Sequence, residues 1–139
     1  MVTLSFSISP KNGSAKLATF ASGMDNRIMA GMKTAGALLE RDMKKKLSGP
    51  GRFKGSTKGP ISRFGNYPGV VSGKLRQSVN FNVSRKSGGP LLVVGPKTNY
   101  AIWLETKESA GRYPFVVPTW EDTGQKAIDE IKKEVMRPL

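Results

Sequence analysis

The fold is decided by one stretch of the chain, residues 25–47, which reads DNRIMAGMKTAGALLERDMKKKL. Its apolar residues recur at steps of three and four, the spacing of one face of an α-helix. They are Ile28, Met32, Ala35, Leu39, Met43 and Leu47, with Met29 and Leu38 widening the stripe. Ser22 and Asp25 are the candidate caps, and three lysines before Ser48-Gly49-Pro50 suit a helix C-terminus. We therefore expect an amphipathic helix about 34 Å long.

Strands are predicted on both sides of this helix. Residues 1–10 alternate apolar and polar side chains as a half-buried strand does. After the helix, residues 74–105 contain three strand-like runs separated by Gly/Pro turns. These runs are Leu75–Ser84, Leu91–Gly95 and Tyr100–Leu104. They predict an antiparallel meander.

A second helix is predicted over residues 119–136. Thr119 and Asp122 form a variant capping box, and apolar residues from Trp120 to Val135 mark a buried stripe. The order helix, sheet, helix predicts a single α+β domain over residues 1–139, in which a small antiparallel sheet packs against a long N-terminal helix and a C-terminal helix. The expected core joins Ile28, Met32, Leu39, Ile128, Ile131 and Trp120 to Leu75, Val79, Phe81, Tyr100, Ile102 and Leu104.

Composition removes most catalytic chemistry. The 139 residues include no cysteine and no histidine, which excludes Cys/His zinc sites and Cys- or His-based catalysis. The ten carboxylates form no evident inward-facing pair, and the Gly-rich residues 49–57 lack the spacing of a phosphate-binding loop. We therefore expect no enzyme activity, catalytic residue, cofactor or metal. Apolar runs of about four residues are too short for a membrane helix, so no membrane partner is expected.

Positive charge is concentrated in one region. The chain has 23 Lys and Arg against 10 Asp and Glu, a net charge of +13, and no acidic residue lies between Met43 and Leu104. Residues 49–73 are predicted to be a long Gly/Pro-rich loop, flexible in an isolated subunit, with aromatics between its cations. Its candidate contact residues are Arg52, Phe53, Lys54, Lys58, Arg63 and Tyr67. The loop suits either a nucleic-acid backbone or an acidic protein surface.

Short motifs in the second half of the chain resemble those of a phage family. They are Ser72-Gly73-Lys74-Leu75-Arg76-Gln77-Ser78, Tyr100-Ala101 with Glu105 four residues on, and Pro114-Phe115-Val116-Val117-Pro118 before the last helix. In order and spacing the chain resembles the neck and tail-completion proteins of long-tailed bacteriophages, of the minor tail protein Z type. The residues that match the motifs are Gly73, Leu75, Arg76, Ser78, Tyr100, Ala101, Glu105, Pro114, Phe115 and Pro118.

The resemblance implies a structural virion protein at the head–tail connection. It implies a ring of six or more copies around the DNA exit channel, in contact with a head-closure or connector protein and with tail proteins, and non-specific contact with viral DNA. Such a protein assembles in the bacterial cytoplasm and resides in the neck or the top of the tail. Two alternatives remain open at this point: a stand-alone basic nucleic-acid-binding module, and a tail-terminator ring protein.

Overall fold

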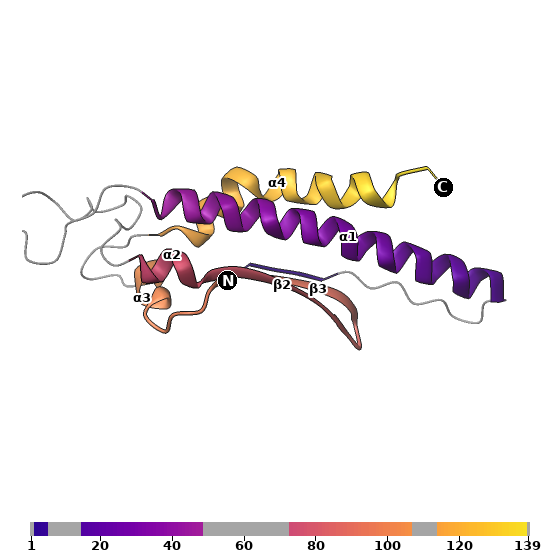
Figure 1. Ribbon diagram of the computed structural model, residues 1–139, viewed down its shortest axis with the longest axis horizontal. Coiled ribbons are helices and arrows are strands. Elements are labelled where there is room, and N and C mark those ends of the chain that lie inside the picture. Colours follow the sequence, from indigo (N-terminus) through magenta and orange to yellow (C-terminus); the bar gives the residue numbers. More distant parts are fainter. Residues whose placement is uncertain (1, 6–14, 49–72, 107–113, 139) are drawn as a thin grey trace, which may run out of the picture.

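The computed structural model describes residues 2–5, 15–48, 73–106 and 114–138, with the backbone alone for residues 15–19 and 106. Within these described ranges, seven elements follow one another (Figure 1). They are β1 (Val2–Ser5), α1 (Ala15–Lys46), α2 (Lys74–Ser78), β2 (Val79–Lys86), β3 (Gly89–Pro96), α3 (Ala101–Thr106) and α4 (Val116–Val135). The α+β fold with a small antiparallel sheet and two long helices is confirmed.

The sheet has three strands in the order β1-β3-β2, and both pairings are antiparallel. Strands β2 and β3 form a hairpin in which Phe81 lies opposite Val94, and Gly89 takes the positive φ of 110° at its turn. Strand β1 adds to the other side of β3, with Val2 opposite Val94. The N-terminal segment therefore supplies the third strand of the sheet.

The third strand predicted at Tyr100–Leu104 is wrong, because this run forms α3. The chain leaves β3 and turns at once, with the Ala101 N–H donating to the Thr98 carbonyl at 3.2 Å and the Trp103 N–H to the Tyr100 carbonyl at 3.1 Å. A short apolar run fits a helix as well as a strand, and β1 already occupies the free edge of β3. The sheet is therefore not the predicted meander.

The first part of the predicted strand Leu75–Ser84 is also helical, as α2. Gly73 adopts a left-handed φ of 73°, and its carbonyl accepts the Gln77 N–H at 2.9 Å. The strand starts only at Val79. The alternating pattern therefore predicts the wrong structure for residues 74–78, which follow a glycine in a left-handed conformation that other residues rarely adopt.

Both long helices begin earlier than predicted, so the predicted caps are wrong. Helix α1 starts at Ala15, which places Ser22 and Asp25 inside it, and α4 starts at Val116, which places Thr119 in its first turns. Thr119 donates its hydroxyl to the Phe115 carbonyl instead of capping the helix. The strand predicted over residues 1–10 is described only at Val2–Ser5, and residues 49–72 of the predicted loop lie outside the described residues.

Helix α1 packs against the sheet on one side and against α4 on the other (Figure 1). Two glycines of α1 allow these contacts: a Cβ at Gly31 would lie 2.7 Å from the Ile131 Cα, and one at Gly36 would overlap the Phe81 ring. The core includes Ile28, Met32, Ala35, Leu39 and Met43 of α1 together with Val79, Leu92, Val94, Phe115, Ala127 and Ile131. Helix α4 thus reaches the sheet mainly through α1, not by covering the sheet directly.

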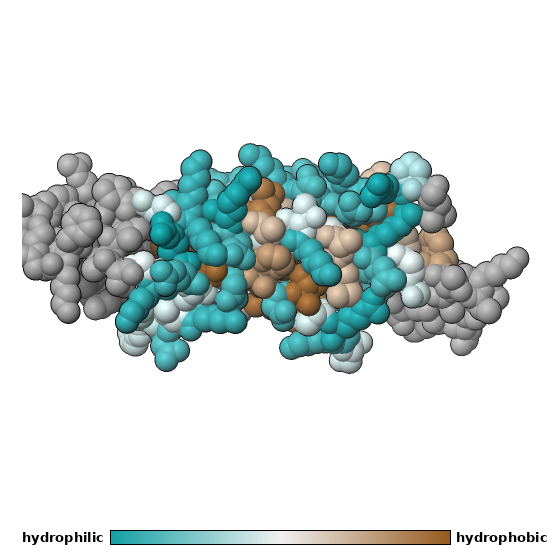
Figure 2. All heavy atoms as spheres, viewed as in Figure 1, coloured by the Kyte–Doolittle hydropathy of each residue, from teal (hydrophilic) through white to brown (hydrophobic). Residues whose placement is uncertain are grey.

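Two residues predicted in the core are exposed. Tyr100, in the turn before α3, and Ile102, on α3, are 46% and 63% exposed, whereas a strand would have placed both side chains on the same inward face. On the face seen in Figure 2, hydrophilic residues predominate, with apolar residues gathered near the middle of its length. None of the described helices is both long and apolar enough to span a membrane.

Candidate functional site

Two of the matching motifs meet at the start of α4. Glu105, near the end of α3, accepts hydrogen bonds from the backbone N–H groups of Phe115 and Val116, both at 2.6 Å. Helix N-termini carry unpaired N–H groups and partial positive charge, both of which a carboxylate satisfies. Pro118, in the same turn, has no N–H to satisfy. Glu105 therefore caps α4 from another element and fixes α3 against it.

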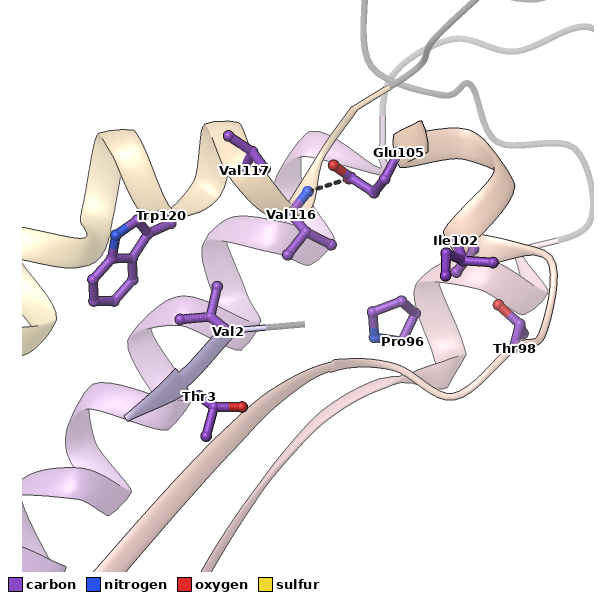
Figure 3. A pocket seen from close by; sticks show the side chains of 10 residues that line it. Val2, Thr3, Pro96, Thr98, Ile102, Glu105, Val116, Val117 and Trp120 are labelled. Carbon is purple, nitrogen blue, oxygen red and sulfur yellow. Dashed lines mark hydrogen bonds between the residues drawn. The ribbon is translucent and has the colours of Figure 1, made fainter. Parts of the chain in front are cut away.

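An apolar groove opens beside this junction, with a volume of about 740 Å³. Figure 3 shows Val2 and Trp120 on one side of the opening, with Pro96 and Ile102 on the other. Its lining comes from four elements and the turn after β3: Val2, Thr3, Pro96, Thr98, Ala101, Ile102, Glu105, Val116, Val117 and Trp120. Glu105 is the ionisable member of this lining, and its carboxylate is already bound by two N–H groups. The groove therefore suits an uncharged, apolar occupant.

Large apolar side chains are exposed around the groove. Ile102 and Trp103 are each 63% exposed, Val117 is 55% exposed and Tyr100 is 46% exposed. Contiguous exposed apolar patches above a few hundred Å² are rare on monomers and mark interaction sites. We call the three α3-side residues Tyr100, Ile102 and Trp103 the α3 patch.

The groove also contains one unusual polar atom. The Thr98 Oγ1 is buried and has no hydrogen-bond partner among the described residues. Buried hydroxyl groups are nearly always paired, because leaving one unpaired costs about 1–3 kcal/mol. The unpaired hydroxyl therefore lies at the wall of the groove and not in the main core.

A second polar feature is an ion-pair cluster that joins α1 to α4. Lys46, whose side chain is only 8% exposed, lies 2.7 Å from Asp42 and 2.9 Å from Asp122. The Thr123 hydroxyl donates to the same Asp42 oxygen at 2.7 Å. The cluster holds the C-terminal end of α1 against α4.

Ionisation of this cluster is tuned by opposing effects. Burial disfavours the charge on Asp42, but hydrogen bonds from Lys46 and Thr123 outweigh burial and lower the pKa of Asp42. Burial likewise disfavours the charge on Lys46, but hydrogen bonds with Asp42 and Asp122 outweigh it and raise the pKa of Lys46. Both groups are therefore held in their charged forms at neutral pH.

Part of the predicted basic region is compensated within the fold. Lys44 pairs with Glu40, Lys46 with Asp42 and Asp122, and Arg85 lies 3.4 Å from Asp25 while donating to Asn26 at 2.5 Å. In contrast, Lys86 and Lys97 line a shallow hollow of about 210 Å³ on the sheet face away from α1, with Asn80, Asn82, Ser84, Leu91, Val93 and Gly95. Some cations in this region thus form ion pairs within the fold, and a count of charges in the sequence cannot separate them from cations available to a partner.

The structure brings the matching motifs only partly together. Glu105, Phe115 and the turn holding Pro114 and Pro118 meet, and Ala101 is buried beside them. Gly73 precedes α2, which contains Leu75, Arg76 and Ser78. The Ser78 hydroxyl donates to the Leu75 carbonyl, and Arg76 donates to Ser48 at 3.2 Å. All six candidate contact residues lie outside the described residues: Arg52, Phe53, Lys54, Lys58, Arg63 and Tyr67.

Nothing in the sequence pattern indicated the groove. The groove is formed by residues as far apart as Val2 and Trp120, and no local pattern joins them. The link between Asp42 and Lys46 had a local signal, the four-residue spacing on one helix face. The contacts of this pair with Asp122 and Thr123 on α4 had no such signal in the sequence.

The part of the chain that the structure describes holds no group of three or more acidic, Cys or His residues that could bind a metal. Comparisons of the chain with protein-family models, with curated proteins and with solved structures give no match. The proposals below therefore depend on the residues and their geometry.

Proposed function

We propose that this chain is a non-enzymatic ring subunit of the head–tail connection of a tailed bacteriophage. In that role it joins head to tail around the DNA exit channel, and its partners are further copies of itself and the adjoining connector and tail proteins. The motif resemblance names the family, and the geometry adds two supports. The groove and the α3 patch are the observation that carries the proposal.

The first support is the exposed apolar surface. A protein that worked alone would gain nothing from exposing Ile102 and Trp103 to water beside an open apolar groove. Burying such side chains releases about 25 cal/mol for each Å² of apolar surface removed from water. A surface of this kind favours a subunit whose fold is completed by neighbours.

The second support is the contact between Glu105 and the start of α4. It joins the Tyr-Ala-x-x-x-Glu motif to the Pro-Phe-x-x-Pro motif by two hydrogen bonds across ten and eleven residues. A shared structural task explains why both motifs would accompany one another in a family. The task is to fix the groove wall, since Glu105, Val116 and Val117 all line it.

The test is genetic complementation of a phage that lacks this protein. Without it, full heads and complete tails should accumulate unjoined, and supply of the wild-type chain should restore infectious particles that contain it. Supply of a variant with Arg52, Lys54, Lys58 and Arg63 neutralised separates the roles of the loop. Joined particles with defective DNA delivery would place the loop charges against DNA, and unjoined particles would place them at an acidic protein surface.

One result would replace the proposal with the nucleic-acid alternative. A chain absent from particles that binds DNA with affinity falling steeply as salt rises would be a stand-alone basic module. The outer sheet face, where Lys86 and Lys97 lie at opposite ends of the β2–β3 hairpin, would be the surface for that alternative.

A further inference from the structure

We propose that Trp103 of one copy inserts into the apolar groove of the next copy, forming a head-to-tail contact. This inference rests on the proposed function, because it assigns the contact by which the ring closes. Its occupant is a second copy of this chain, and both halves of the contact are present on every copy.

On α3, the residue that lines the groove and the residue proposed to insert into a groove point in different directions. Ile102 lines the groove, whereas Trp103, the next residue along α3, is not part of the lining and is 63% exposed. Successive helical residues point about 100° apart, so a rigid α3 cannot place its own Trp103 in its own groove. Filling the groove with this indole therefore requires another molecule.

Size and chemistry favour a tryptophan as occupant. The groove volume of about 740 Å³ exceeds what one indole needs, so Trp103 can enter together with a neighbour such as Tyr100. Large aromatic side chains bury about 150–250 Å² each and are the usual anchors of protein interfaces. Val2, Pro96, Val116 and Trp120 offer apolar walls against which an indole packs.

Charge favours a second copy over an acidic partner at this place. Each copy carries a net charge of +13, so copies can associate only where cations are not forced together. The described lining contains no Lys or Arg, and Glu105 is bound by two N–H groups. An acidic partner would be recognised by cations, which this groove lacks, whereas an identical copy brings the apolar α3 patch.

A contact between two different surfaces of the same chain has a geometric consequence. Such heterologous interfaces generate closed rings, or open filaments where the rotation does not close. The same pairing used reciprocally, with each of two molecules inserting Trp103 into the other's groove, would instead give a symmetric dimer. The mass of the wild-type assembly distinguishes the two arrangements, and a wild type that stops at the dimer would overturn the ring.

The experiment uses two variants, each damaging one half of the contact. Trp103→Ala removes the inserted side chain, and Val117→Arg places a charged side chain at the groove rim on a residue that is already 55% exposed. Phe20→Ala is the matched control, because Phe20 is an aromatic with 57% exposure on the part of α1 far from α3 (Figure 1). Circular dichroism melts establish that each variant keeps its fold, and native mass spectrometry reads the assembly.

We expect rings for the wild type and for Phe20→Ala, and loss of all species above the monomer for Trp103→Ala and for Val117→Arg. An equimolar mixture of the two damaged variants should form dimers and nothing larger, because one intact Trp103 and one intact groove remain between them. Rings that persist in both single variants would overturn this contact but would still support the proposal that the chain forms a ring. A wild type that remains monomeric would overturn both the contact and the ring.

Discussion

At the scale of single residues, Glu105 contributes both to the capping of α4 and to the lining of the groove. Its carboxylate satisfies two N–H groups at the start of α4 and holds one wall of the groove. An exposed glutamate at the end of a short helix would ordinarily be replaceable at little cost. Here its loss leaves backbone donors unpaired at a half-buried helix end.

We predict that Glu105→Ala lowers the free energy of unfolding by about 0.5–2 kcal/mol, the range found for loss of a helix cap. Glu105→Gln should lose less, because both N–H groups donate to the same Oε1, which an amide oxygen can replace, so that only the negative charge is lost. Urea denaturation of the three proteins measures the difference. Equal stability of Glu105→Ala and the wild type would show that the cap contributes nothing.

The cluster of Asp42, Lys46 and Asp122 predicts a specific dependence of stability on pH. The folded-state pKa of Asp42 is lowered, so its stabilisation is present above its unfolded pKa, about 3.9, and is lost as the pH falls through the folded value. The folded-state pKa of Lys46 is raised, so its stabilisation is present below its unfolded pKa, about 10.4, and is lost as the pH rises through the folded value.

Asp42→Asn should therefore flatten the loss of thermal stability at acidic pH while retaining an acceptor for the Thr123 hydroxyl. Melting temperatures of both proteins from pH 2 to pH 7 give the comparison. Glu121→Gln, on an exposed residue of α4, serves as the control and should leave the acidic limb unchanged. Parallel curves for Asp42→Asn and the wild type would remove this ion pair from the account of acid stability.

At the scale of elements, the close approach of α1 to its two neighbours depends on glycine. Glycine inside a helix costs about 1 kcal/mol relative to alanine, so alanine would be preferred wherever space allows. A Cβ at Gly31 would lie 2.7 Å from the Ile131 Cα and 3.2 Å from the Ile131 carbonyl oxygen, which are backbone atoms of α4. At Gly36 it would meet the side chains of Phe81 and Leu92.

We predict that Gly31→Ala and Gly36→Ala lower the melting temperature, because α4 or the sheet must move away from α1. Gly23→Ala is the matched control: it lies in the same helix with nothing within 4 Å of its Cβ, and should gain up to about 1 kcal/mol. Thermal melts of the three variants separate the loss of stability caused by steric overlap from the gain caused by the higher helix propensity of alanine. A gain of similar size at all three positions would contradict the close packing of α1.

The elements that sequence predicted well are those with long periodic stripes. In α1 the apolar spacing from Ile28 to Leu47 repeats over more than five turns. The structure buries all six residues of this apolar stripe, Ile28, Met32, Ala35, Leu39, Met43 and Leu47. In contrast, Tyr100–Leu104 is one short apolar run, which sequence periodicity cannot assign to helix or strand. The cap of α4 escaped prediction because Glu105 reaches it from another element, and sequence rules consider only neighbouring residues.

At the scale of the whole molecule, a layered fold leaves two kinds of surface for partners. One is the uncovered sheet face with Lys86 and Lys97, and the other is the apolar groove with the α3 patch. The sequence predicted that charge would matter, from the absence of acidic residues between Met43 and Leu104. It could not predict the groove, because that surface exists only after β1, β3, α3 and α4 have come together.

The central claim is that this chain is a ring subunit, and the mass of the purified protein in solution tests it most directly. Sedimentation equilibrium or native mass spectrometry at several protein concentrations gives that mass without any partner protein. The account predicts one dominant closed species of at least six times the 15.1 kDa of a single chain. A single 15.1 kDa species at every concentration would contradict it.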